Sequence, residues 1–282
     1  MTDVFRLAVA QSFVAAEPAE NGQAIRAMMR QASAAGARLA HFPEGAATGY
    51  PSGPAKTALA GWPLDWALVR RELEATAELA GELGLWVVVG AAHPLEPPHR
   101  PHNSLYVISD QGRLVARYDK RRLSFGEVND WFTPGFDPLT VDIDGFRFGF
   151  ALCLEINFPD LFMAYEQMDA DAVLVSSFSR DPIFGVLAQG HAAANNMWLS
   201  FATPAQCSSA FPSGVVGPHG YWLAQAPGHG AQALAIVDLD RNAPELETAL
   251  CKARPWRRAS REGAVYAKLR AVGPRSLDHT RF

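Results

Sequence analysis

The sequence predicts a layered α/β (or α+β) domain in which two mixed β-sheets pack together and are flanked by helices. Apolar segments of strand length alternate with longer segments of helical periodicity, which indicates both element types along the chain. Some neighbouring strands are joined by tight turns and others by helices, so the sheets should be mixed. The strands also follow one another at close spacing, which favours two packed sheets over a single one.

The first part of the chain contains strands and helices in alternation. Residues 5–12 form an apolar strand, and residues 19–35 form an amphipathic helix that ends at Gly36. A second strand over 38–44 ends on an acid. The next helix is expected from its cap Asp65 to a closing glycine at position 84, before a buried strand over 85–92.

Two hairpins follow, and the second half then repeats the alternation. Short polar turns identify the hairpins, and a third turn at Gly217–Gly220 indicates another one. In the strand 146–152, alternate residues should face opposite sides of the sheet. The expected elements are hairpins 103–109 with 113–120 and 139–143 with 146–152, strand 172–177, helix 186–196, strand 197–203 and strand 233–240.

Composition narrows the class of protein. Lys plus Arg number 25 and Asp plus Glu number 29, so the net charge of −4 predicts no general attraction to nucleic acid. The N-terminal segment lacks a secretory pattern, and apolar runs are too short to span a bilayer, which predicts a cytoplasmic protein without membrane contact. Three scattered cysteines predict no disulfide framework and no metal site. With no convincing linker, residues 1–282 are expected to form one domain, with 254–282 as a basic C-terminal arm.

Three polar residues stand where predicted strands end, at the edge of a sheet where active sites gather. They are Glu44 in "HFPEGAATGY", Lys120 in "RLVARYDK" and Cys153 in "GFALCLEINFPD". Each alone has an ordinary explanation: a turn cap, a solvated lysine and an inert buried cysteine. Their combination suggests a nucleophile with a base and a cation.

The ordered motifs "FPEGAATGY", "YDKRRLSFGE" and "CLEINFPD" resemble those of the nitrilase (carbon–nitrogen hydrolase) superfamily, in the manner of an amidase-like member. The resemblance covers nearly the whole chain and implies a four-layer αββα sandwich without metal or organic cofactor. It also implies a homodimer or higher homo-oligomer. On the family pattern, Glu44 is the general base, Lys120 the lysine and Cys153 the nucleophile, and Glu127 in "FGE" matches an auxiliary acid.

The chemistry of these residue types agrees with that assignment. A thiol is mostly protonated near neutral pH, so Cys153 needs a base, and Glu44 can take its proton and return it to departing ammonia. Lys120 and the backbone N–H of Leu154 are expected to stabilise the oxyanion. Glu127 is expected to position the substrate or to tune Glu44 by like-charge repulsion.

Several further positions carry less definite expectations. Tyr50, Trp131 and Phe178 lie near the three motifs and are expected either to line a substrate pocket or to pack in the core. The chain departs from the family pattern at His191, Ala194 and Met163, where charged residues are common. These departures should change packing or assembly more than chemistry.

The predicted function is hydrolysis of a non-peptide C–N bond, foremost conversion of a small carboxamide to an acid and ammonia. N-carbamoyl compounds are a close alternative substrate class, and nitriles come next. The aromatic residue that commonly follows the cysteine in nitrile-cleaving relatives is replaced here by Leu154. A catalytically silent relative that only binds a ligand is the alternative from another class, and the intact set of Glu44, Lys120 and Cys153 argues against it.

Overall fold

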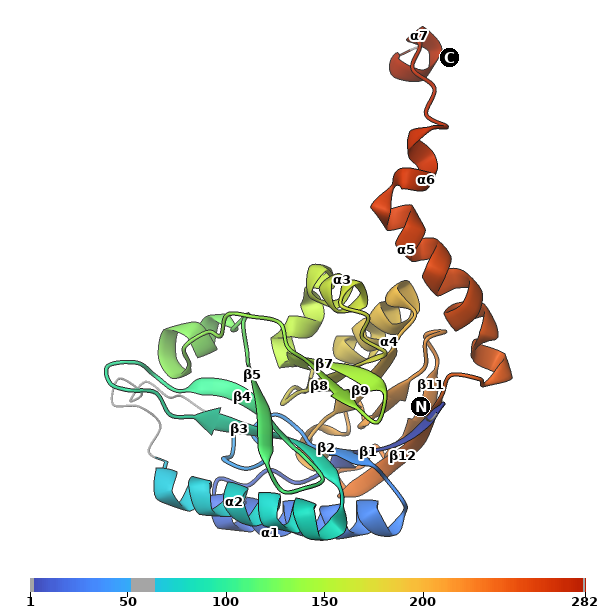
Figure 1. Ribbon diagram of the computed structural model, residues 1–282. Helices are drawn as coiled ribbons and strands as arrows, with labels where there is room; N and C mark the ends of the chain where they lie inside the picture. The colour runs from blue at the N-terminus through green and yellow to red at the C-terminus, as the bar shows by residue number, and fades with distance from the viewer. Residues whose placement is uncertain (1–2, 52–63, 281) are drawn as a thin grey trace.

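Two six-stranded sheets face each other in a computed structural model that describes residues 3–51, 64–280 and 282. Residues 1–2, 52–63 and 281 of the predicted domain lie outside the described part. Figure 1 shows the sheets enclosed by helices on both outer faces. This arrangement confirms the predicted αββα sandwich.

The first sheet has the strand order β12-β1-β2-β3-β4-β5. Strands β1, β2 and β3 run parallel, whereas β12 and β4 are antiparallel to their neighbours, so the sheet is mixed. Because β5 is antiparallel to β4, it ends at the same edge as β2 and β3. The bounds are β1 Val4–Gln11, β2 Leu39–His41, β3 Trp86–His93, β4 His102–Ile108, β5 Leu114–Asp119 and β12 Ala233–Asp240.

The second sheet has the order β11-β10-β9-β8-β7-β6. Strands β7, β8 and β9 are parallel, and the hairpins β6–β7 and β10–β11 flank them. The bounds are β6 Thr140–Ile143, β7 Phe146–Leu152, β8 Ala172–Ser176, β9 Trp198–Ala202, β10 Gly214–Val216 and β11 Trp222–Gln225.

Helices cover the outer faces of the sheets. Figure 1 places α1 (Pro18–Ala34) and α2 (Trp66–Leu83) against the first sheet, and α3 (Pro159–Gln167) and α4 (Ile183–Asn195) against the second. As expected, the side chain of Asp65 caps α2, and Gly84 ends it with a φ of 59°. Apolar side chains fill the space between the sheets, including Phe148 and Phe150 from alternate positions of β7.

Short helical turns complete the chain, and a helical arm ends it. The turns are η2 Glu127–Trp131, η3 Cys153–Asn157, η4 Ala205–Cys207, η5 Pro244–Leu246 and η6 Thr248–Ala253. The arm consists of α5 (Arg254–Glu262), α6 (Ala264–Ala267) and α7 (Pro274–Leu277), and it projects away from the sandwich in Figure 1. No helix among the described residues is long and apolar enough to cross a membrane.

The predicted strand over residues 38–44 was too long, because β2 ends at His41. Phe42 still donates its N–H to Val88 O at 2.8 Å. Pro43 has no N–H, so the chain leaves the sheet at that point. The acid expected at the end of the strand therefore lies in the loop that follows it.

Candidate active site

Strands of both sheets end at one edge of the sandwich and bring the predicted catalytic residues there. Glu44 lies three residues beyond β2, Lys120 directly follows β5, and Cys153 directly follows β7. Phe178 lies two residues beyond β8 and donates its backbone N–H to Glu44 Oε2 at 2.8 Å, which joins the two sheets at this edge.

The loop that carries Glu44 packs tightly on strand β3. Gly45 has a φ of 68°, a conformation that a side chain would strain. A Cβ atom at Gly90 would lie 2.4 Å from the carbonyl oxygen of Pro43. These two glycines therefore allow the loop to fold back on the sheet and to bury Glu44 completely.

Glu44 uses both carboxylate oxygens. Its Oε1 accepts hydrogen bonds from Lys120 Nζ at 3.0 Å and from Asn103 Nδ2 at 2.8 Å. Its Oε2 accepts from the Phe178 N–H, and a carboxylate oxygen can accept a second bond. Oε2 therefore has one hydrogen-bond donor and Oε1 has two.

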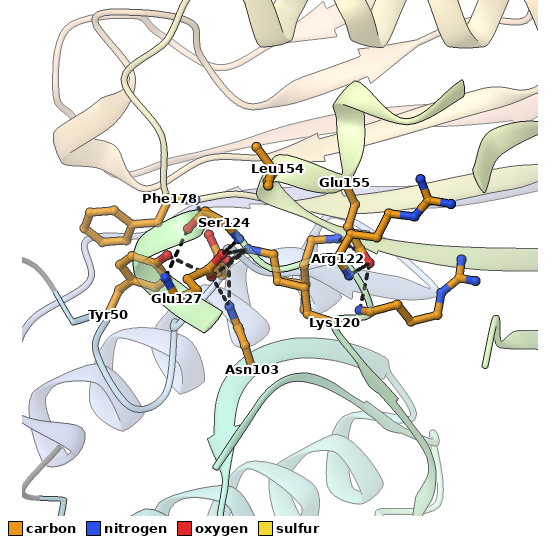
Figure 2. A network of polar contacts seen from close by, with 12 residues as sticks. Tyr50, Asn103, Lys120, Arg122, Ser124, Glu127, Leu154, Glu155 and Phe178 are labelled. Atoms are coloured by element: carbon orange, nitrogen blue, oxygen red, sulfur yellow. Dashed lines mark hydrogen bonds and ion pairs between the residues drawn. The ribbon is translucent and has the colours of Figure 1, made fainter. Parts of the chain in front are cut away.

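Lys120 is buried without exposed surface and is the cation of the site. Its Nζ contacts Glu127 Oε1 at 2.7 Å and Oε2 at 2.9 Å, in addition to Glu44 (Figure 2). Burial alone would lower the pKa of Lys120, but the charges of Glu44, Cys153 and Glu127 raise it above its usual value. Lys120 is thus a fixed ammonium.

Glu127 is also buried and has more donors than Glu44. Its Oε1 accepts from Tyr50 Oη at 3.0 Å and Asn103 Nδ2 at 3.1 Å, and its Oε2 accepts from the Ser124 N–H at 2.7 Å (Figure 2). With Lys120 added, the carboxylate is saturated. This arrangement favours the expected tuning of Glu44 over direct contact with a substrate.

The two carboxylates have shifted pKa values of opposite sign. Burial raises the pKa of Glu44, the charge of Glu127 raises it further, and Lys120 only partly compensates. For Glu127, burial also acts to raise the pKa, but Lys120 and the Ser124 hydrogen bonds outweigh it, and the pKa is lowered. The pKa of Glu44 therefore lies above its usual value and that of Glu127 below it.

Cys153 occupies the turn between β7 and η3 and is only partly exposed. Its φ of 46° lies in the left-handed region, which is uncommon for a residue other than glycine. Burial and the charge of Glu44 raise the pKa of the thiol to about 12, although Lys120 and the Ser177 hydroxyl act to lower it. The sulfur is therefore a thiol at neutral pH and needs a base.

Two of the three predicted pocket residues, Tyr50 and Phe178, contact the carboxylates. Tyr50 and Phe178 stack with ring centroids 5.0 Å apart, and each contacts one of the carboxylates, so both belong to the site. Trp131 is the last residue of η2, the turn that begins at Glu127. Leu154 follows the cysteine in the first turn of η3, where backbone N–H groups have no partner inside the helix.

Sequence reasoning missed two polar residues. Asn103 is the second residue of β4 and bonds both Glu44 and Glu127, and its carbonyl oxygen accepts the Lys120 N–H at 2.8 Å. His41 lies fully buried between the sheets, with Ser176 Oγ and Ser200 Oγ each 2.8 Å from a ring nitrogen. In the sequence, the only indication of a role for either residue is a polar side chain within an otherwise apolar strand.

The departures from the family pattern also have positions in the structure. His191 Nε2 donates to the carbonyl oxygen of Ile156 in η3 at 2.7 Å, and its ring stacks on Phe162 at 4.0 Å. Met163 is exposed on α3, and Ala194 lies on α4. His191 therefore packs against the turn that begins at Cys153. Within residues 3–51 and 64–280, no group of three or more His, Cys, Asp or Glu side chains could hold a metal ion.

Comparison with known proteins decides the family, because a model of carbon–nitrogen hydrolases matches residues 6–245. The chain belongs to the carbon–nitrogen hydrolase family. Human deaminated glutathione amidase is 28% identical to this family member over 189 residues, which are 61% of the chain and 55% of that protein. The chain spans about half the length of that relative and of a Dictyostelium discoideum nitrilase homolog, which is 26% identical over 50% of the chain.

Other similar proteins span more of the chain. The hydrolase Rv0480c of Mycobacterium tuberculosis is 29% identical over 83% of this carbon–nitrogen hydrolase and 90% of its own length. An amidase of the nitrilase superfamily from Nesterenkonia sp. AN1 has a TM-score of 0.73 at 23% identity, covering 89% of this chain and 97% of its own. At that identity the similarity shows the shared fold.

Proposed function

We propose that this carbon–nitrogen hydrolase converts a small carboxamide to a carboxylic acid and ammonia through a thioester on Cys153. The observation that carries the proposal is the unequal pair of buried carboxylates on one lysine beside the thiol. Glu127 and Lys120 form a saturated ion pair, and Glu44 retains an oxygen that can receive a proton. A site built only to bind a ligand has no need of such a base.

The reaction begins with transfer of the Cys153 proton to Glu44. The thiolate attacks the amide carbonyl carbon, and the negative charge passes to the carbonyl oxygen, where Lys120 and the Leu154 N–H stabilise it. Glu44 then gives its proton to the departing nitrogen, and ammonia leaves. Glu44 next deprotonates a water that attacks the thioester, which releases the acid and returns the proton to the thiol.

Stabilisation of the oxyanion by Lys120 requires one change in its contacts. Its three N–H groups face Glu44 Oε1 and both oxygens of Glu127. One of the two contacts with Glu127 can be exchanged for the oxyanion while the other holds the ion pair. Because Lys120 contacts Glu127 twice, one N–H group can move to the oxyanion of the intermediate while the other keeps the ion pair.

The names of related proteins support an amide as the substrate class. The Nesterenkonia amidase was solved with acrylamide and with butyramide, both small carboxamides. Deaminated glutathione amidases are amidases by name, although this chain spans about half of them. N-carbamoyl compounds would meet the same attack and the same departing nitrogen, so they belong in any substrate panel.

The test is ammonia release from a panel of small amides, N-carbamoyl compounds and nitriles. Activity with at least one amide is expected, and Cys153→Ala should abolish it. Cys207→Ala and Cys251→Ala are the matched controls and should retain activity. An active Cys153→Ala variant, or iodoacetamide inactivation that labels Cys207 and spares Cys153, would contradict the assignment.

We also propose that the protein forms a homodimer or a larger homo-oligomer, in which the arm contacts a second copy. Arginines fasten α5 to the sandwich: Arg258 and Arg261 bond Glu166, and Arg257 bonds Asn196. Beyond α5 the arm exposes apolar side chains, among them Leu269 and Leu277. A second copy would remove this apolar surface from water.

Light scattering of the full chain should give at least twice the monomer mass. Leu269→Glu combined with Leu277→Glu should lower that mass or weaken the association. Leu114→Glu, at an exposed leucine on β5, is the control and should leave the mass unchanged. A monomer at micromolar concentration would contradict the proposal.

A further inference from the structure

Glu155 is a buried carboxylate that the proposed mechanism does not use. It lies two residues beyond Cys153 in η3 and has no exposed surface. Figure 2 shows its side chain on the far side of Lys120 from the Glu127 cluster, directed toward the backbone beside Arg122. A buried carboxylate is costly unless its oxygens are bonded, so its partners indicate why it is there.

Each oxygen of Glu155 accepts from two donors, and the four donors come from two segments of the site. Oε2 accepts from the Leu152 N–H at 2.8 Å and from Tyr118 Oη at 2.8 Å. Oε1 accepts from the backbone N–H groups of Arg121 at 2.9 Å and Arg122 at 3.1 Å. One carboxylate therefore joins the residue before the nucleophile to the residue after Lys120.

The protonation state of Glu155 follows from these partners. All four groups are donors, and an ionised carboxylate accepts hydrogen bonds without donating any. Burial raises the pKa of Glu155, and the hydrogen bonds and the charge of Lys120 act against that rise. Only the charged form satisfies all four donors at once.

The nucleophile turn needs such an anchor. Cys153 is held at a φ of 46°, and residues in that region persist only where the surrounding structure holds them. The peptide between Ala151 and Leu152, one residue before the cysteine, is fixed by the bond from the Leu152 N–H to Glu155. If this bond is lost, the turn can relax toward an ordinary φ and move the sulfur away from Lys120.

We propose that Glu155 is a positioning residue that fixes the nucleophile turn relative to Lys120. It contacts neither the substrate nor the thiol, and it acts through the backbone on both sides of the reacting groups. The proposal rests on the proposed function, because it gives Cys153 and Lys120 a shared task. It extends that function to the boundary at which the loop after β5 meets the turn after β7.

Glu155→Gln alters only the hydrogen bonds that cross this boundary. An amide has one donor and one acceptor end, so its NH₂ group must face one of the two pairs of donors. Toward Tyr118 the hydroxyl can turn and accept, which leaves the Leu152 N–H without an acceptor. Toward Arg121 and Arg122 two backbone donors would lose their acceptor. The first arrangement is less costly, so the variant should release the nucleophile turn.

The control is Glu166→Gln. Glu166 is equally buried and accepts from Arg258 at 3.1 Å and Arg261 at 2.7 Å. These two arginines belong to the C-terminal arm. Both variants should lower the melting temperature. Glu155→Gln alone should lower kcat for an amide by at least tenfold with little change in KM, and should slow iodoacetamide alkylation of Cys153 at least fivefold at pH 7.

Alkylation needs no substrate, so this measurement tests Glu155 even if no amide in the panel is turned over. A folded Glu155→Gln variant with wild-type kcat and wild-type alkylation would overturn the proposal and leave Glu155 a packing group. Should that variant fail to fold, Tyr118→Phe removes one donor from Oε2 and keeps the charge. It should lower kcat and alkylation about twofold to fivefold, and no change in either would equally overturn the proposal.

Discussion

Glu44 and Glu127 are both buried carboxylates that contact Lys120 Nζ, yet they differ in how many donors they have. Glu127 contacts the ammonium with both oxygens and also accepts from Tyr50, Asn103 and Ser124. Glu44 contacts the ammonium with one oxygen, which also accepts from Asn103, and directs the other to a single backbone N–H. Their pKa values are accordingly shifted in opposite directions.

The comparison teaches that burial does not by itself make a general base. Burial acts to raise the pKa of both groups, but the charge of Lys120 and the hydrogen bonds from Lys120 and Ser124 lower that of Glu127, whereas the charge of Glu127 adds to the rise at Glu44. The saturated carboxylate becomes the counterion of the lysine. The less saturated one keeps a higher proton affinity and can serve as base and acid in turn.

The largest expected effect is that of Glu44→Gln. The amide cannot accept the thiol proton or return one to the leaving nitrogen, so both steps lose their catalyst. Turnover of an amide should fall by about 10²- to 10⁴-fold, the usual contribution of general acid–base catalysis. Steady-state kinetics check it, with circular dichroism to confirm the fold. A variant within threefold of wild type would remove Glu44 as the base.

Glu127→Gln should have a smaller effect of about 10- to 100-fold, because it weakens the base without removing it. Without Glu127, Lys120 pairs with Glu44 alone, and the like charge that raises the pKa of Glu44 is gone. Both changes lower that pKa. Wild-type activity should fall as pH drops through the raised pKa of Glu44, and in the variant this acid limb should move to lower pH.

The pH dependence of kcat/KM between pH 4 and 8 measures the shift. An unchanged acid limb in Glu127→Gln would show that the two carboxylates are not coupled. A limb displaced to higher pH would reverse the roles assigned to them.

The next prediction concerns the choice between amides and nitriles. An amide brings an N–H that can bond the open oxygen of Glu44, and a nitrile brings none. With a nitrile this buried oxygen keeps only the Phe178 N–H, and the missing second hydrogen bond costs about 1–3 kcal/mol, or roughly one to two decades of rate. Matched pairs that differ only in C≡N and C(=O)NH₂ should therefore show higher kcat/KM for the amide. A nitrile turned over faster than its amide would be contrary evidence.

The smallest effect at neutral pH concerns His41, three residues before Glu44 on the inter-sheet face. Ser176 Oγ donates to the Phe42 carbonyl at 2.7 Å, so it must accept from His41 Nε2–H, and Nδ1 then accepts from Ser200. The ring is thus neutral, and burial lowers its pKa to about 3. An unfolded histidine binds a proton at a pKa of about 6.5.

Unfolding therefore takes up a proton at acid pH, and stability should be lost as pH falls from about 6.5 toward 3. His41→Gln should flatten the pH dependence of the unfolding free energy in that window by up to about 1.4 kcal/mol per pH unit. Urea titrations at pH 6, 5 and 4 provide the measurement. Parallel slopes for the two proteins would show that His41 is not the titrating group.

Much of the fold could be predicted from local sequence. Polar turns located the hairpins, and the period of apolar residues distinguished strands from helices. The positions of Lys120 and Cys153 directly after strands could be predicted in the same way, whereas Glu44 lies in the loop beyond β2. The length of β2 could not, because Pro43 interrupts a strand whose apolar pattern continues.

The residues that contact the predicted site residues could not be predicted from local sequence. Asn103 and Phe178 bond Glu44 from 59 and 134 positions away in the sequence, so only the packing of the sheets brings them together. The opposite pKa shifts of Glu44 and Glu127 depend on a count of donors from five separate segments. The role of Glu155 likewise depends on backbone groups more than 30 positions away.

The central claim is that Glu44 moves the proton while Glu127 holds the charge of Lys120. Alkylation of Cys153 by iodoacetamide needs a thiolate but no protonated leaving nitrogen, so it separates the two tasks of Glu44. In Glu44→Gln the thiol loses its base, but loss of the nearby negative charge should also lower the thiol pKa and offset part of that loss. Alkylation at pH 7 should therefore fall by less than about tenfold, while amide turnover falls at least 100-fold because the leaving nitrogen also loses its proton donor. Equal losses of alkylation and turnover would contradict the claim.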